Sequence, residues 1–329
     1  MTPQQKIISG LLDKFSDATS KTIARMAFQQ FPQVFLSIDA ARNTVRRLRG
    51  AYGKNQPMNK KYIRPKQTPG DPFAALPEAK RHFDDWKALQ IDGPRKVLVL
   101  SDIHIPYHDV DALRLALTYG KACGADTILL NGDIADFFSV SFWEKDPRER
   151  DLAAEIESVK TFLNVLRESF PKAEILYKLG NHEERWIRYL SVKAPELLGI
   201  PDFEFDQIFN FASLGIKLVA DRVPIRLGYL NVIHGHEYRS VSSPVNPARG
   251  FFLRAKTHVL GGHLHQTSQH SEKNLEDKVV SAWSTGCLCD LHPDYAVLNQ
   301  WNLGFAFVTI SKNGTFEVSN MKIINGEIL

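Results

Sequence analysis

Five short stretches of the sequence carry side chains that bind metal ions, and each follows an apolar run. In chain order they read SDIH, NGDIAD, GNHE, HGH and GHLH. Imidazole, carboxylate and amide-oxygen ligands together suit Mn, Fe or Zn better than Mg or Ca. The sequence therefore predicts a metal centre built from distant parts of the chain. Its candidate ligands are Asp102, His104, Asp133, Asn181, His234, His263 and His265.

The spacing within these stretches supports convergence on one centre. Asp102 and His104 are two residues apart, as are His263 and His265. On an extended chain such side chains point the same way, so each pair can reach one ion.

A single fragment also has an ordinary explanation. Asn181 could cap a helix whose first turn carries Glu183 and Glu184. Five fragments in succession, all at expected strand ends, favour a shared site instead. Glycines before the ligands allow a sharp turn or close backbone approach, at Gly132, Gly180 and Gly262.

The ordered set resembles the calcineurin-like metallophosphoesterase superfamily. The family motifs D-x-H, G-D-x-x-D, G-N-H-[ED], H-G-H and G-H-x-H occur here in that order, between residue 96 and about residue 310. The resemblance implies a four-layer αββα sandwich that hydrolyses phosphoesters with a hydroxide bridging two divalent ions, for which Mn²⁺ is expected first and Fe, Zn or Ni are alternatives. One ion would be held by Asp102, His104, Asp133 and His265. The other would be held by Asp133, Asn181, His234 and His263, with Asp133 as the bridge.

Three neighbouring residues are candidates for catalysis. His182 is not a ligand in the family pattern and is the expected general acid. Asp136 is expected to accept the N–H of His182 or to orient a ligand. Arg185 is expected either to clamp the phosphate or to pair with a nearby carboxylate. Other histidines lack this context and are interpreted as surface or structural residues: His108, His258, His270 and His292.

The elements that must position these residues follow from apolar patterning. Short apolar runs at 96–101, 127–131 and 174–179 are typical of buried strands, and helical patterns at 110–121 and about 150–170 separate them. This alternation predicts an α/β core with parallel strands. Beyond residue 216 the chain is rich in strand patterns, which we expect to form a second sheet packed on the first.

The N-terminal fifth of the chain is distinctly basic. Residues 1–68 contain 13 Lys or Arg against three Asp, a net charge of +10, whereas the remainder carries 28 basic against 34 acidic residues. Helical patterns occur at 3–15, 19–31 and 38–50. We expect a basic helical domain at 1–68, a Pro-rich linker at 69–94 with a helical pattern at 77–90, and a phosphoesterase domain at 95–329.

The third helical pattern predicts a helix-turn-helix that contacts nucleic acid. Its apolar face carries Ile38, Ala41, Val45 and Leu48. A second face is basic, so the candidate nucleic-acid contacts are Arg42, Arg46, Arg47 and Arg49. A solvated helix face in a small bundle is the alternative. Residues 31–53 also resemble N-terminal helical segments of phage and prophage phosphoesterases.

These features lead to two functional hypotheses. The first is a nuclease or phosphodiesterase acting on nucleic acid, since a basic helical domain precedes a phosphoester-cleaving core. The second is a phosphatase or phosphodiesterase of a small nucleotide or phosphoprotein, with the N-terminal domain used for assembly. Residues 137–151 mix aromatic and charged side chains, and they could line a substrate groove or cap it.

Composition sets the remaining expectations. The chain has 329 residues, 43% of them hydrophobic and 24% charged, which is ordinary for a globular protein. It shows no signal-peptide pattern and no apolar run of about 20 residues, so we expect a cytoplasmic protein without membrane contact. Cys123, Cys287 and Cys289 are odd in number and are expected to be reduced thiols. An oligomer is neither required nor excluded.

Overall fold

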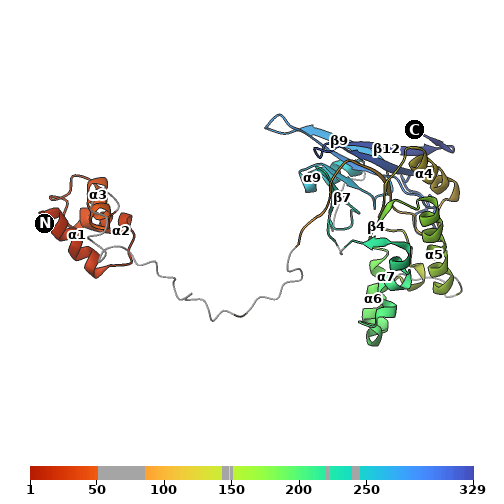
Figure 1. Ribbon diagram of the computed structural model, residues 1–329, viewed down its shortest axis with the longest axis horizontal. Coiled ribbons are helices and arrows are strands. Elements are labelled where there is room, and N and C mark those ends of the chain that lie inside the picture. Colours follow the sequence, from red (N-terminus) through yellow and green to blue (C-terminus); the bar gives the residue numbers. More distant parts are fainter. Residues whose placement is uncertain (51–76, 78–85, 143–147, 149–150, 220–221, 239–244) are drawn as a thin grey trace. The chain divides into compact units, whose positions relative to one another are not determined.

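The computed structural model describes residues 1–50, 77, 86–142, 148, 151–219, 222–238 and 245–329. The chain divides into two compact units, Met1–His82 and Phe83–Leu329 (Figure 1). Each unit is described by itself below.

The N-terminal unit contains three helices around a small core, and they lie where the sequence predicts them. They are α1 (Pro3–Lys14), α2 (Ser20–Gln30) and α3 (Ile38–Leu48). Each begins at a hydroxyl side chain that accepts a backbone N–H, as Ser37 does at the start of α3. Val45 and Leu48 are buried against the other helices. Ile38, expected on the same face, is 38% exposed.

A seven-stranded sheet forms the centre of the second unit. Its order is β13-β12-β11-β2-β3-β4-β5. Strands β2 to β5 are parallel neighbours, and β11, β12 and β13 continue the sheet in antiparallel pairs. The bounds are β2 (Arg95–Leu100), β3 (Thr127–Asn131), β4 (Glu174–Lys178), β5 (Ile216–Leu218), β11 (Gly304–Ile310), β12 (Phe316–Ile324) and β13 (Glu327–Ile328).

A six-stranded sheet packs against the first. Its order is β1-β6-β7-β8-β10-β9, and β7, β8 and β10 are parallel neighbours. The bounds are β1 (Leu89–Ile91), β6 (Ile225–Leu227), β7 (Leu230–Ile233), β8 (Val259–Gly261), β9 (Ser268–Lys273) and β10 (Val279–Ser284).

Side-chain alternation along the strands produces four layers. Along β2, Leu98 and Leu100 join the core beneath the helices, whereas Val97 and Val99 join the core between the two sheets. Helices α4 (Val110–Ala122) and α5 (Leu152–Ser169) contribute to the first core, and α9 (Pro247–Ala255) packs Phe251 on the outer face of the second sheet. The expected αββα architecture is therefore confirmed.

Shorter helices complete the second unit, and Figure 1 shows α6 and α7 in green below β4. They are α6 (Glu184–Lys193), α7 (Phe205–Ile208), α8 (Phe211–Leu214) and the 3-10 helices η2 (Phe138–Val140), η4 (Pro195–Leu197), η5 (Pro201–Phe203) and η6 (Asp294–Ala296).

Two expectations about the elements need correction. The helical pattern at 77–90 ends in strand β1, which pairs in parallel with β6, while residues 78–85 lie outside the described part. The strands after residue 216 do not all form the second sheet, because β5, β11, β12 and β13 join the first. Local patterning marks a strand but does not say which neighbour it pairs with.

Two smaller expectations concern the cysteines and the membrane. Cys123, Cys287 and Cys289 are free thiols. Of the helices that the structure describes, none combines the length and apolar character needed to cross a bilayer.

Candidate metal centre

The strand order brings the candidate ligands to one edge. Asp102 and His104 follow β2, Asp133 follows β3, and Asn181 follows β4. Since these three strands are parallel neighbours, their carboxyl ends share one edge of the sheet. From the second sheet, the ends of the parallel neighbours β7 and β8 supply His234, His263 and His265.

Asp133 is the residue that joins the two halves of the centre. One oxygen of its carboxylate lies close to a ring nitrogen of His104 and one of His182, with all three atoms within 4.8 Å of one another. A carboxylate oxygen of Asp133 also lies within the same distance of ring nitrogens of His234 and His263. A carboxylate shared by two clusters is placed as a bridging ligand would be.

His265 forms a further group of candidate ligand atoms with Asp102 and His104. Its Nε2 lies 3.1 Å from Asp102 Oδ1 and 3.2 Å from His104 Nε2. Asp102 is fixed in turn by the hydroxyl of Ser101, which donates at 2.6 Å, and by the backbone N–H of His263. Two imidazole nitrogens and a carboxylate oxygen therefore face one another in a buried place.

Buried polar atoms without partners show that these residues fit divalent ions. Asn181 Oδ1 and His263 Nδ1 are buried and have no hydrogen-bond partner among the described residues. An unsatisfied buried polar atom is unfavourable unless something binds it. His234 Nδ1 bonds the carbonyl of Asn131 at 2.8 Å, which leaves its Nε2 directed at Asp133 Oδ2, 3.2 Å away. Nitrogen and oxygen donors in this arrangement suit transition-metal ions.

The backbone of the ligands differs from the expected extended form. Five of them adopt the left-handed region with φ between +52° and +67°, namely Asp102, His104, Asp133, His263 and His265. This conformation is unfavourable for residues other than glycine, and it accumulates at functional sites. The ligand pairs thus converge through tight turns at the strand ends.

Gly132 and Gly180 leave no room for a side chain beside a candidate ligand. At Gly180 a Cβ atom would overlap Asp133 Oδ1, so the close approach is real and no side chain fits. Gly132 lies at φ +88° and has its Cβ position filled by the ring of His234. Both glycines bring the chain close to a candidate ligand.

The three candidate catalytic residues form one connected group. Asp136 Oδ2 lies 3.0 Å from His104 Nδ1 and 3.2 Å from His182 Nδ1, so Asp136 serves both expected purposes at once. Arg185 pairs with Asp136 Oδ1 at 3.1 Å, and its Nη2 lies 2.9 Å from His182 Nε2. Of the two expectations for Arg185, the carboxylate pair is present.

The charges in this group support one another. Burial opposes ionisation of Asp136, but hydrogen bonds from His104 and His182 hold the pKa of its carboxyl well below the usual range. Burial likewise disfavours a charged His182, yet Asp133 and Asp136 raise the pKa of that imidazole above its ordinary value. Asp136 is thus a fixed anion that orients two rings.

Glu183 organises the turn that carries Asn181 and His182. It is fully buried, and its carboxylate accepts five hydrogen bonds. The expected helix start is present, since α6 begins at Glu184, but Asn181 does not cap it. Glu183 instead uses its carboxylate to hold two strand-end turns together. The donors are the backbone N–H groups of Asp133, Ile134, Ala135 and Gly180 and the hydroxyl of Tyr177.

Sequence reasoning missed two residues near the centre. Cys289 groups with His104 and His265 within 4.8 Å, although the sequence predicts for it only a reduced thiol. His292, interpreted as a surface or structural residue, lines a cavity beside His104 and Asp136. Neither residue belongs to a metal-ligand motif, so only the folded loop reveals them. His236 pairs with Glu184 at 3.0 Å.

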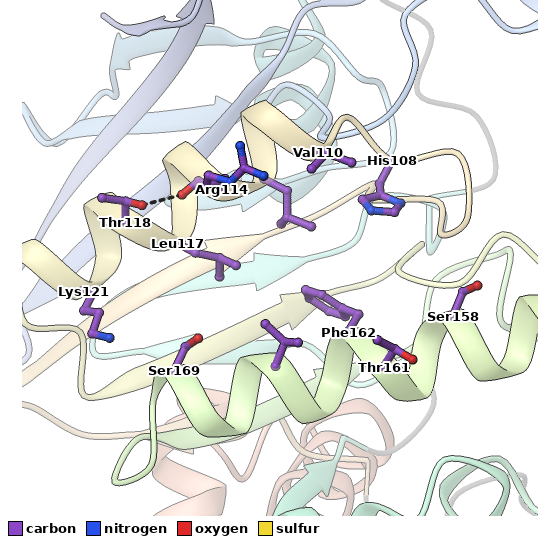
Figure 2. A pocket seen from close by; sticks show the side chains of 12 residues that line it. His108, Val110, Arg114, Leu117, Thr118, Lys121, Ser158, Thr161, Phe162 and Ser169 are labelled. Atoms are coloured by element: carbon purple, nitrogen blue, oxygen red, sulfur yellow. Dashed lines mark hydrogen bonds between the residues drawn. The ribbon is translucent and has the colours of Figure 1, made fainter.

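A cavity of the second unit lies away from the metal centre. It has a volume of about 620 Å³ and lies between α4 and α5. Figure 2 shows Leu117 of α4 and Phe162 of α5 reaching into this space. None of the candidate ligands lines it, so it is not the site of the chemistry.

The four candidate nucleic-acid contacts differ in exposure. Arg42 and Arg47 are exposed and Arg46 is half-buried. Arg49 instead donates to Ser20 Oγ at 3.0 Å and to the carbonyl of Ala18 at 2.6 Å. It ties the end of α3 to the turn before α2, a role inside the unit that helical periodicity alone does not reveal.

Comparison with known proteins gives the following matches. The sequence profile of the calcineurin-like phosphoesterases matches residues 95–285. The Gene 54 protein of Mycobacterium phage L5 is 26% identical over 230 residues, covering 66% of this chain and 89% of the phage protein. The Gene 54 protein of Mycobacterium phage D29 is 26% identical over 233 residues, covering 67% of this chain and 90% of the phage protein.

Solved structures provide more distant matches. Vacuolar Protein Sorting 29 from Cryptosporidium parvum matches with a TM-score of 0.38 and 14% identity, over 71% of this chain and 94% of that one. The phosphoesterase YfcE from E. coli matches with a TM-score of 0.31 and 15% identity, over 68% of this chain and 98% of that one.

The profile match spans more than half of the chain and includes all the candidate ligands. The chain belongs to the calcineurin-like phosphoesterase family, and it is a phosphoester hydrolase with a candidate site for two divalent metal ions.

Proposed function

We propose that this hydrolase cleaves phosphodiester bonds of nucleic acid. The observation that carries the proposal is the combination, in one chain, of a phosphoesterase centre with a basic helical unit of net charge +10 over residues 1–68. Clustered basic charge is the electrostatic footprint expected of a nucleic-acid partner. Neither unit alone leads to this conclusion.

The residues at the centre have distinct parts in the reaction. Asp102, His104, Asp133 and His265 would hold one ion, and Asp133, Asn181, His234 and His263 the other. Two divalent ions there, with Mn²⁺ proposed, would acidify a water and neutralise charge on the phosphoryl oxygens. The water gives up one proton to solvent and attacks phosphorus, the bond to the leaving oxygen breaks, and His182 donates a proton to that oxygen.

Asp136 and Arg185 prepare His182 for this step. Asp136 holds the Nδ1 side of the ring, so the Nε2 side faces the ligand cluster, 3.8 Å from Asp133 Oδ2. The guanidinium of Arg185 lies against Nε2, at 2.9 Å. An arriving phosphoryl group attracts Arg185, and Nε2 then becomes available to carry the proton.

On the N-terminal unit, we assign the nucleic-acid contacts to Arg42, Arg46 and Arg47. Arg49 is left out because its guanidinium already bonds the turn before α2. A helix-turn-helix would offer α3 to a groove of the duplex, where arginines bind phosphates and base edges.

The test compares three proteins with added Mn²⁺: the full chain, a chain beginning at residue 83, and the triple variant Arg42→Ala, Arg46→Ala, Arg47→Ala. Substrates are labelled single- and double-stranded DNA and a bis-aryl phosphodiester. We expect the truncation and the triple variant to lose most DNA cleavage while hydrolysis of the small ester is unchanged. The salt slope of DNA binding should flatten by about 0.9 for each phosphate that the variant no longer neutralises.

A charge-matched control separates specific contacts from bulk charge. The triple variant Lys172→Ala, Lys193→Ala, Lys312→Ala removes the same charge from exposed positions of the other unit and should leave the DNA salt slope unchanged. Hydrolysis of the small ester alone, with no DNA cleavage by the full chain, would contradict the nuclease and favour a small-nucleotide or phosphoprotein substrate.

A further inference from the structure

A second cavity lies directly beside the metal centre. Its volume is about 230 Å³, and His104 and Asp136 form part of its wall. The remaining wall comes from three segments of the chain. They are the loop after β2 with Tyr107, η2 after β3 with Phe138, and the loop after β10 with Cys289, Asp290, His292, Pro293, Asp294 and Tyr295. Because His104 belongs to both places, a group in this cavity would lie next to the reacting phosphate.

Three aromatic residues, Tyr107, Phe138 and Tyr295, form part of the wall of this cavity. Tyr107 and Phe138 meet edge to face with centroids 6.0 Å apart, and Tyr295 is 6.2 Å from Trp301, which contacts His265 at 4.1 Å. Tyr295 is 71% exposed and Tyr107 is 45% exposed. Large rings left in water beside a reaction centre offer faces on which a flat ligand can stack.

The loops that carry these rings are fixed by hydrogen bonds. The backbone N–H of Asp290 donates to the carbonyl of Tyr107 at 2.9 Å, which joins the loop after β10 to the loop after β2. The side chain of Asn299 donates to the carbonyls of Leu291 and Ala296, both at 2.6 Å, and so closes the loop around Tyr295. The backbone that carries Tyr107 and Tyr295 is therefore held by hydrogen bonds within the protein.

The charge of the wall restricts the ligand. Carboxylates of Asp290 and Asp294 line the cavity, and the described wall residues include no Lys or Arg. The carboxylate of Asp136 also reaches the wall, but it is paired with Arg185, His104 and His182. A second phosphate would be repelled there, whereas an uncharged heterocycle with N–H donors would find acceptors. The volume lies below the roughly 300 Å³ at which ligand pockets usually begin, which suits a single base.

We propose that this cavity binds the nucleobase of the nucleotide whose phosphate is hydrolysed, with the base stacked on Tyr295 and Tyr107. This inference rests on the proposed function and deepens it. A chain continuing past that base would bring another phosphate against the carboxylates. The favoured substrate is therefore a nucleoside phosphoester at the end of a strand or in a small nucleotide ester.

The experiment uses two diesters that release the same p-nitrophenolate: thymidine 5′-(p-nitrophenyl phosphate) and methyl p-nitrophenyl phosphate. With the full chain and Mn²⁺, we expect kcat/KM to favour the thymidine ester by about tenfold or more, the gain from one stacked base. Tyr295→Ala and Tyr107→Ala should bring the ratio close to one, and Tyr295→Phe should keep it.

The matched control is Tyr229→Ala. Tyr229 is similarly exposed, at 62%, but lies beside Gly314, and its replacement should leave both rates unchanged. A ratio near one for the full chain, or a ratio that survives both alanine variants, overturns the base site while the phosphoesterase stands. Failure to hydrolyse either ester would instead contradict the proposed function.

Binding of thymidine itself gives a readout that does not depend on turnover. Saturation-transfer NMR should show magnetisation passing from the full chain to the base, and no such transfer from Tyr295→Ala; no transfer from the full chain overturns the proposal. Linear and covalently closed single-stranded DNA distinguish the two substrate sources. Cleavage of the linear strand from its end supports a strand terminus, and rapid cutting of the circle contradicts the site. Cleavage of neither contradicts the proposed nuclease, and the base site then serves a small nucleotide ester.

Discussion

At the residue scale, Glu183 shows how the centre depends on a side chain outside the expected ligand set. Its carboxylate accepts N–H groups from Asp133 and Gly180, residues on two different strand-end turns. The GNHE motif identifies this position, but its five bonds become visible only when the turns are folded. The contact of Arg185 with His182 and the left-handed backbone of the ligands are likewise visible only in the folded chain, because motif spacing does not encode loop conformation.

We expect Glu183→Gln to weaken metal binding by about 10- to 100-fold, since a supporting group of the ligands is removed. An amide offers one acceptor oxygen and turns its NH₂ group toward backbone donors that need an acceptor. Titration with Mn²⁺ followed by calorimetry measures the affinity. Glu196→Gln, at an exposed position, is the control, and equal affinities in both variants would remove Glu183 from this supporting role.

At the element scale, the sequence predicted α4 and α5 from their helical periodicity and the parallel strands from their continuous apolar runs. It missed β1 because three residues provide no period, and the strand exists through pairing with β6. It also could not foresee Glu155, an acidic residue of an amphipathic helix that is only 4% exposed. Burial, together with Asp136, raises the pKa of Glu155 to about 7.

Glu155 should make stability depend on pH. Its ordinary pKa is 4.5, so between pH 4.5 and about 7 the folded chain binds more protons than the unfolded chain. The free energy of unfolding therefore falls as pH rises through this window, by up to roughly 3 kcal/mol from this group.

Glu155→Gln should remove that dependence. We expect the variant to gain stability relative to the unmodified chain at pH 8 but not at pH 5, in chemical unfolding at fixed metal concentration. Glu157→Gln, on the same helix with an exposed side chain, should change neither value. A wild-type-like slope in Glu155→Gln would show that the carboxyl titrates normally.

At the scale of the whole molecule, the catalytic unit begins earlier than the motifs indicate. The apolar pattern starts near residue 95, but the compact unit begins at Phe83 and includes β1, whose Ile91 is buried between the sheets. Sequence patterning predicted the basic N-terminal charge and its helices, whereas the contacts that set the boundary are tertiary. The functional link between the two units stays a proposal.

Truncation tests this boundary. A chain beginning at residue 83 should keep the unfolding temperature of the catalytic unit, whereas one beginning at residue 95 should unfold about 5–10 °C lower, because the buried Ile91 and an edge strand are removed. Differential scanning calorimetry compares the two. Equal temperatures would mean that β1 contributes little to the second sheet.

The left-handed backbone at five ligand residues also sets fold stability against metal binding at those positions. Glycine at any of these positions would relieve strain and remove a ligand at once, so fold stability and catalysis favour opposite residues there. If a population were selected for heat resistance with no requirement for activity, substitutions to glycine should appear at these positions first. A lineage that retains Asp102, His104, Asp133, His263 and His265 together is one in which hydrolysis has been continuously selected.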